Sequence, residues 1–113
     1  MITIYHNSRC SKSRDGVCFL ENAQQPFETI NYLENTPTKA KLKALLKKLK
    51  MTPIELVRKK ETVWVENYKD KELSDDEIIQ IMVQNPILIE RPIVVNGRKA
   101  VIARPMERIN EIL

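Results

Sequence analysis

Apolar and polar residues follow two different periods along this chain, and the period changes at recognisable turn and capping residues. Residues 2–5 and 27–31 read as short strands. Residues 11–25 show helical spacing between them, and Pro26 stops that helix. Two strands joined by one helix predict a βαβ unit with a right-handed crossover.

The middle of the chain carries three helix start signals. Thr38 can cap a lysine-rich helix, and Thr52-Pro53-Ile54-Glu55 combines a capping threonine, a proline at the first helical position and a glutamate. Ser74-Asp75-Asp76-Glu77 is a second capping box, and it opens a helix that Asn85-Pro86 closes. Residues 59–73 have no clean period, so Val63-Trp64-Val65 could be a brief strand or a buried anchor. The pattern therefore predicts a helical middle.

The last part of the chain predicts a β-hairpin and one more helix. Residues 93–95, then Asn96-Gly97, then residues 99–103 have the spacing of a two-residue hairpin. Pro105 opens a final helix, whose predicted inner face is formed by Met106, Ile109 and Leu113. The expected order of elements is βαβ, a helical middle, and ββα.

Length and charge limit the class of protein. The 113 residues predict one domain, residues 1–113, with a helical insertion at about 38–85. The net charge of +4 suits an anionic ligand. The lysines concentrate in one run: Lys39, Lys41, Lys43, Lys47, Lys48 and Lys50. Leucines lie between the lysines at helical spacing. This pattern favours the solvent-exposed side of an amphipathic helix over a nucleic-acid surface.

Several kinds of site and location are disfavoured. No apolar run reaches the roughly 20 residues that span a bilayer, and no signal peptide is evident, so we expect a cytoplasmic protein that does not bind membranes. One histidine and two cysteines give no cluster of metal ligands, and no metal or bound cofactor is expected.

Cys10 is the strongest candidate for chemistry. It follows the first strand and stands at the mouth of the first helix, where unpaired N–H groups and the helix dipole favour a thiolate. His6, Arg9, Lys12 and Arg14 add cationic or hydrogen-bonding groups nearby. A nucleophilic cysteine and an anion pocket can share such a position.

Cys18 is expected to be a core residue, because Val17, Phe19 and Leu20 surround it in sequence. Eight positions separate it from Cys10, which is about 12 Å along a helix. A disulfide requires Cα atoms within about 7 Å, so no bond between the two cysteines is expected.

The order of elements, with a reactive cysteine after the first strand, indicates a thioredoxin-like α/β fold with a mixed four-stranded sheet. Arg91-Pro92, just before the third strand, resembles the cis-proline of that fold. Longer blocks of sequence carry a more specific resemblance: Tyr5-His6-Asn7-x-x-Cys10, Tyr32-Leu33-Glu34-Asn35, Leu56-Val57-Arg58-Lys59, Asn85-Pro86-Ile87-Leu88-Ile89-x-Arg91-Pro92-Ile93-Val94-Val95 and Arg104-Pro105. By these blocks the chain resembles the glutaredoxin-coupled arsenate reductases, including the less characterised members of that family.

The resemblance implies roles for individual residues. Cys10 would be the nucleophile, His6 would assist or orient it, and Arg58, Arg91 and Arg104 would bind the oxyanion. Pro92 would have a structural role beside the cysteine. The substrate would be arsenate or a similar oxyanion, with glutathione as co-substrate and glutaredoxin as partner. Taken singly, Arg58 or Arg104 could equally be a surface residue, and a histidine at a strand end is often only a hydrogen-bonding residue.

Two other functions stay open at this stage. An Spx-like regulator would share the fold and bind RNA polymerase, although such regulators often carry a Cys-x-x-Cys pair that is absent here. A general glutathione-dependent thiol oxidoreductase would use the arginines to bind glutathione carboxylates. A phosphatase-like arsenate reductase is disfavoured, because its Cys-x5-Arg loop would require arginine where Gly16 stands.

Overall fold

The strands at the two ends of the chain form one mixed sheet in the computed structural model, which describes residues 1–113. β1 (Ile2–His6) pairs in parallel with β2 (Phe27–Asn31) and antiparallel with β3 (Ile93–Asn96). β4 (Lys99–Ile102) pairs antiparallel with β3, so the strand order is β2-β1-β3-β4. The predicted βαβ and ββ pairings and the mixed four-stranded sheet are confirmed.

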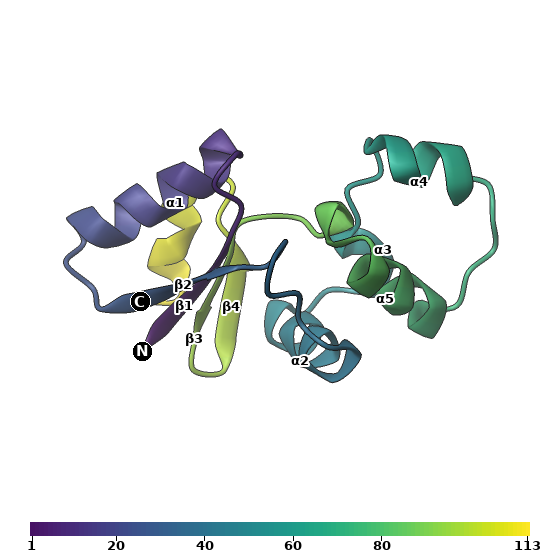
Figure 1. Ribbon diagram of the computed structural model, residues 1–113. Coiled ribbons are helices and arrows are strands. Elements are labelled where there is room, and N and C mark those ends of the chain that lie inside the picture. The colour runs from purple at the N-terminus through teal and green to yellow at the C-terminus, as the bar shows by residue number, and fades with distance from the viewer. The chain divides into compact units, whose positions relative to one another are not determined.

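Helix α1 (Ser11–Asn22) connects β1 to β2 and covers the sheet together with the C-terminal 3₁₀ helix η2 (Met106–Glu111), which packs beside it (Figure 1). The core beneath them contains Ile4, Leu20 and Val94, all fully buried. α1 ends earlier than predicted, because Gln24 adopts a left-handed conformation with φ 56° before Pro26. This layer of sheet and helices carries the candidate nucleophile.

The expectation for Cys18 is wrong, because this side chain is exposed. The buried side of α1 is formed by Ser13, Gly16 and Leu20. Cys18 is two positions from both Gly16 and Leu20, which places it about 200° around the helix from each. Its apolar sequence neighbours therefore do not bring it into the core.

Two details of the C-terminal part also differ from the prediction. Asn96 pairs with Lys99 across the hairpin, so the two-residue turn is Gly97-Arg98 and not Asn96-Gly97. Gly97 has φ +62°, the left-handed conformation that glycine adopts without strain.

The last helix is 3₁₀, with three residues per turn instead of 3.6. Its inner side therefore takes Ile109 and Ile112, whereas Leu113 is exposed. Pro105 precedes this helix and follows Arg104 through a cis peptide bond. The period of the helix, and not its position, was the error in the prediction.

Residues 36–90 form a second compact unit, distinct from the unit made by residues 1–35 and 91–113. It contains α2 (Lys39–Leu49), α3 (Pro53–Leu56), α4 (Thr62–Asn67), α5 (Asp75–Gln84) and the 3₁₀ helix η1 (Pro86–Leu88). α5 contacts α2, α3 and η1 (Figure 1). The predicted helical middle is confirmed, and the prediction that the whole chain acts as one domain stays a prediction.

The predicted caps of this second unit are present. The Thr38 side chain accepts a hydrogen bond from the Lys41 N–H at 3.2 Å, and Glu55 Oε1 accepts from the Thr52 N–H at 2.9 Å. Ser74 and Glu77 exchange the two hydrogen bonds of a capping box, at 3.0 and 3.2 Å. These bonds satisfy the first N–H groups of the helices and explain where each helix begins.

The undecided stretch around Trp64 is helix α4, and Trp64 is its buried residue. Of the two readings, the buried anchor is therefore correct and the strand is not. None of the helices in the structure has both the length and the apolar character needed to cross a membrane.

Candidate active site

Cys10 is the N-cap residue of α1, at the end of a tight loop that leaves β1. Its N–H donates to the Asn7 carbonyl at 3.0 Å, and its own carbonyl accepts the first helical hydrogen bond, from the Arg14 N–H at 3.0 Å. The side chain is half-buried. The thiol therefore lies where the first N–H groups of the helix have no helical partner.

Two arginines of the same unit lie beside this sulfur. Arg104 Nη1 is 3.9 Å from Cys10 Sγ, and it also donates to the Arg91 carbonyl at 3.2 Å. Arg91 is only 8% exposed, and its guanidinium group donates a hydrogen bond to Cys10. The family resemblance implied that both residues lie at the site, and the structure brings both to the cysteine.

The register of the C-terminal hairpin explains why these arginines meet. Ile93 pairs with Ile102, so the same register two positions further out places Arg91 opposite Arg104. The Ala103 N–H extends the ladder by donating to the Pro92 carbonyl at 3.0 Å. A hairpin thus converts two residues that are distant in sequence into a pair of cationic groups at one end of the sheet.

The pKa of the Cys10 thiol is lowered from its ordinary value. Partial burial works against ionisation and raises it, but the backbone N–H of Ser13, the Arg91 guanidinium and the backbone N–H of Lys12 together outweigh burial. The first and last of these are helix N-terminal donors, and the second combines a hydrogen bond with a positive charge. The predicted thiolate therefore has a physical basis in the structure.

His6 contacts the site through another residue. Its Nδ1 lies 2.7 Å from the hydroxyl oxygen of Ser13. Burial lowers the pKa of His6, a hydrogen bond with the backbone of Ser13 partly opposes this, and the charge of Arg14 lowers the pKa further. At neutral pH the imidazole is therefore neutral. Its assisting role stays a prediction, and the observed contact is with Ser13.

Arg58 lies in the second compact unit, just after α3. Its Nη1 is 2.7 Å from Glu90 Oε1 and its Nε is 3.2 Å from Glu61 Oε1. Burial lowers the pKa of Arg58, but the two carboxylates outweigh it and raise that pKa. The structure thus gives Arg58 two carboxylate partners in its own unit, and its predicted part in oxyanion binding stays a prediction.

Sequence reasoning missed Gly16 as a residue that shapes the site. A Cβ atom at this position would lie 3.1 Å from Pro92 Cγ and 3.2 Å from Ile4 Cδ1, which is tighter than ordinary contact. Pro92 follows Arg91 through a cis peptide bond, as the resemblance to the thioredoxin fold implied. The small residue thus lets α1 approach the loop that holds Arg91, and a lone glycine inside a helical pattern was the available signal.

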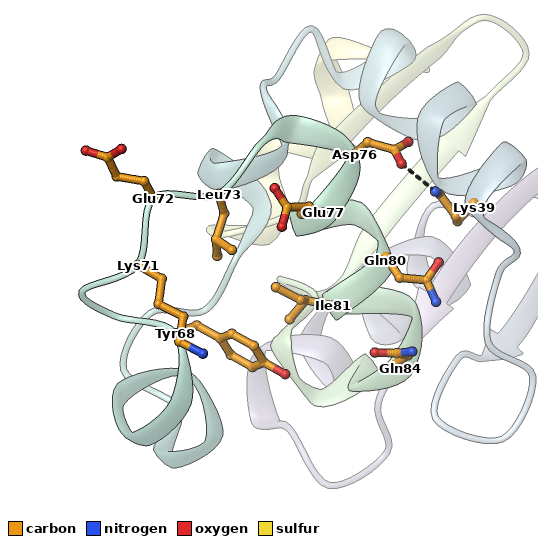
Figure 2. Close-up of a pocket in the computed structure, with 10 residues that line it drawn as sticks. All are labelled: Lys39, Tyr68, Lys71, Glu72, Leu73, Asp76, Glu77, Gln80, Ile81 and Gln84. Atoms are coloured by element: carbon orange, nitrogen blue, oxygen red, sulfur yellow. Dashed lines mark hydrogen bonds and ion pairs between the residues drawn. The ribbon is translucent and has the colours of Figure 1, made fainter.

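A cavity lies in the second unit, whose residues 36–90 contain no cysteine (Figure 2). It measures about 730 Å³, and Leu73, Ile81 and the Tyr68 ring give it apolar walls. Its rim carries both signs of charge, including the Lys39–Asp76 ion pair at 2.8 Å. Without a thiol among its lining residues it is not a candidate for thiol chemistry.

The sheet order, with a cysteine where β1 meets α1 and a cis-proline before β3, defines a thioredoxin-like protein. Within that class the sequence is specific, because the model of the ArsC family matches residues 5–112. The chain belongs to the ArsC family, as its motifs predicted.

Three relatives cover almost the whole chain. It is 49% identical to the uncharacterized protein YfgD of Escherichia coli K12, over 99% of this chain and 96% of that protein. It is 37% identical to the arsenate reductase of the same organism, over 99% of this chain and 80% of that enzyme. A solved structure of an arsenate reductase from Vibrio cholerae superposes with a TM-score of 0.94 at 42% identity, covering 99% of this chain and 97% of that one.

Proposed function

We propose that this protein reduces arsenate to arsenite, with Cys10 as the nucleophile. The observation that carries the proposal is a thiol of lowered pKa with Arg91 and Arg104 beside it. Two of its relatives, from Escherichia coli and Vibrio cholerae, are named arsenate reductases. Membership of the same family makes the same reaction class the first choice for this chain.

The arrangement suits the charge problem of the reaction. Arsenate is a small tetrahedral dianion, and a thiolate that attacks it carries a like charge. Guanidinium groups neutralise and orient such oxyanions through planar, permanently charged donors. Arg91 and Arg104 lie close enough to Cys10 to hold the anion where the sulfur can reach it. We assign Arg58 to the same task as a third contributor, on the resemblance alone.

We propose that arsenate is reduced in three steps. The Cys10 thiolate attacks arsenic, a sulfur–arsenic bond forms, and one arsenate oxygen leaves as water. The glutathione thiol then displaces a second oxygen as water and forms a second sulfur–arsenic bond. A glutaredoxin thiolate attacks the glutathione sulfur and forms a mixed disulfide with it, and the electron pair of the broken sulfur–arsenic bond stays on arsenic, which is reduced from As(V) to As(III). Hydrolysis of the remaining bond between Cys10 and arsenic releases arsenite and the Cys10 thiolate.

External thiols are required because this chain offers no internal partner for Cys10. Cys18 is free and exposed, and eight helical positions correspond to about 12 Å along the helix axis. That separation exceeds the roughly 7 Å between Cα atoms that a disulfide allows. The reaction therefore needs two further thiols, and we propose glutathione as co-substrate and glutaredoxin as partner on the resemblance to the glutaredoxin-coupled arsenate reductases.

The test is arsenate-dependent NADPH oxidation, coupled through glutathione, glutaredoxin and glutathione reductase. We expect turnover by the wild-type protein and by Cys18→Ser, and no turnover by Cys10→Ser. Cys18→Ser is the matched control, since it removes the other sulfur from the same helix at an exposed position. A folded wild-type protein without turnover would overturn the proposal and favour a general glutathione-dependent thiol oxidoreductase.

A further inference from the structure

Ser13 is a fully buried serine on the first turn of α1, with 0% of its surface exposed. Its hydroxyl oxygen accepts a hydrogen bond from the Asn7 N–H at 2.9 Å and lies 2.7 Å from His6 Nδ1. A serine inside a helix usually bonds to a carbonyl of the preceding turn or points to solvent. Here the hydroxyl leaves the helix and contacts the loop that precedes it.

That contact fixes the start of the loop that ends in Cys10. The Asn7 carbonyl accepts from the Cys10 N–H at 3.0 Å, and the Asn7 side-chain oxygen accepts from the Arg9 N–H at 3.0 Å. Asn7 is itself only 3% exposed. Ser13 is therefore hydrogen-bonded to the backbone of Asn7, and the backbone of Asn7 is hydrogen-bonded to that of Cys10.

One arrangement of protons satisfies every group in this cluster. Ser13 Oγ accepts from the Asn7 N–H, so its own proton is available for His6 Nδ1. The imidazole is neutral at pH 7, because burial and Arg14 lower its pKa, and its Nδ1 can accept that proton. The remaining ring proton is then on Nε2, and no buried donor of the cluster lacks an acceptor.

We propose that Ser13 is a positioning residue for the Cys10 sulfur, and that this serine links the sulfur to His6, whose assisting role the family resemblance already implies. The inference rests on the proposed role of Cys10 as nucleophile. Ser13 also supplies a backbone N–H to the sulfur, so one residue fixes both the loop and a donor of the thiol. Arg91 and Arg104 attract the negative charge of the Cys10 thiolate, whereas Ser13 determines where the sulfur lies.

The test uses Ser13→Ala in a Cys18→Ser background, so that Cys10 is the one remaining thiol. We measure the pH dependence of Cys10 alkylation by iodoacetamide, which needs neither arsenate nor glutathione. Without the hydroxyl, we expect the apparent thiol pKa to rise and alkylation at pH 6 to slow by about three- to tenfold, up to one pKa unit. The matched control is Ser11→Ala, an exposed serine on the same helix, with an unchanged profile expected.

A second pair of variants separates positioning from simple packing. Ser13→Thr keeps the hydroxyl and should restore most of the alkylation rate. His6→Ala should shift the profile in the same direction as Ser13→Ala, and the double variant should shift it no further. A folded Ser13→Ala protein with the control profile, or additive shifts in the double variant, would overturn the proposal.

If Ser13→Ala does not fold, two measurements on the wild-type protein test the same hydrogen bonds. Nitrogen-15 spectra of the imidazole should place the His6 proton on Nε2, and hydrogen exchange at the Asn7 amide should be slow. A proton on Nδ1, or exchange of the Asn7 amide at the rate of an exposed loop, would contradict the cluster. These outcomes are independent of arsenate turnover, so they distinguish failure of this inference from failure of the proposed function.

Discussion

At the scale of single residues, the chemistry of Cys10 depends on opposing effects on one sulfur. Burial raises the pKa of the thiol, and the helix N–H groups with Arg91 lower it by more. The sequence could predict the lowering groups, because a cysteine at a helix start and an arginine before a proline are visible in the chain. It could not predict Ser13, because a serine between charged residues gives no sign that its hydroxyl is buried.

Replacing Arg91 by alanine should weaken both the anion site and the thiolate. Each charge-assisted hydrogen bond is worth about 1.5–3 kcal/mol, so kcat/KM for arsenate should fall by about 10- to 100-fold. Arg91 lowers the pKa of Cys10, so its removal should raise that pKa and move the alkylation profile to higher pH. Steady-state kinetics and iodoacetamide titration measure the two effects separately.

Arg91→Lys is the matched variant for this prediction. Lysine keeps the positive charge but loses the planar guanidinium group. We therefore expect a thiol pKa close to that of the wild-type protein and a kcat/KM between those of the wild type and Arg91→Ala. Kinetics and a thiol profile that do not change in Arg91→Ala would remove Arg91 from the site.

Cys18 marks the limit of reasoning from neighbours in sequence. Its apolar neighbours predicted burial, but the angle of each residue around α1 decides exposure. Because Ser13 and Gly16 occupy the buried side, the helix looks less apolar in sequence than its packing requires. Two small residues allow close packing there, which a hydrophobicity pattern does not record.

At the scale of helices and strands, the capping residues at helix starts were more informative than the period of apolar residues. The caps at Thr38, Thr52 and Ser74 predicted three helix starts because each depends on hydrogen bonds within four residues. The hairpin turn and the last helix were less predictable. The turn lies one residue later because pairing of whole strands sets the register, and the last helix is 3₁₀.

The contact between α1 and the loop before β3 gives a prediction at this scale. Alanine is more favourable than glycine in a helix by about 1 kcal/mol, so propensity alone predicts that Gly16→Ala stabilises the protein. The new Cβ would however meet the rigid ring of Pro92 and the fully buried Ile4. We expect a net loss of about 1–2 kcal/mol in the free energy of unfolding, measured by urea denaturation.

Ser11→Ala serves as the control for Gly16→Ala, since it is exposed on the same helix. We also expect Gly16→Ala to slow Cys10 alkylation, because Pro92 is adjacent to Arg91. A Gly16→Ala protein as stable as wild type would contradict the expected loss, because the contact with Pro92 and Ile4 would then cost no more than the helix propensity of alanine gains.

At the scale of the whole molecule, the net charge of +4 and the anion site predict different responses to salts. Inorganic phosphate is tetrahedral and is not reduced by thiols, so it can occupy the arsenate site without reaction. At 100 times its dissociation constant a ligand stabilises the folded state by about 2.7 kcal/mol. We expect phosphate to raise Tm by more than sodium chloride does at equal ionic strength.

The double variant Arg91→Ala/Arg104→Ala tests whether this stabilisation is local. It should lose the specific part of the phosphate effect and keep the response to sodium chloride, because general screening does not depend on two residues. Thermal denaturation measures both responses. If phosphate raised Tm equally in the wild type and in the double variant, the stabilisation would come from the total charge and not from the two arginines.

The order of the two compact units along the chain has a genetic consequence. Cys10 precedes the helical segment in the sequence, and Arg91 and Arg104 both follow it. A premature stop codon anywhere in that segment would leave the nucleophile in the product and delete both guanidinium groups with two strands of the sheet. Stop codons within that segment should therefore be as damaging as loss of the cysteine codon itself.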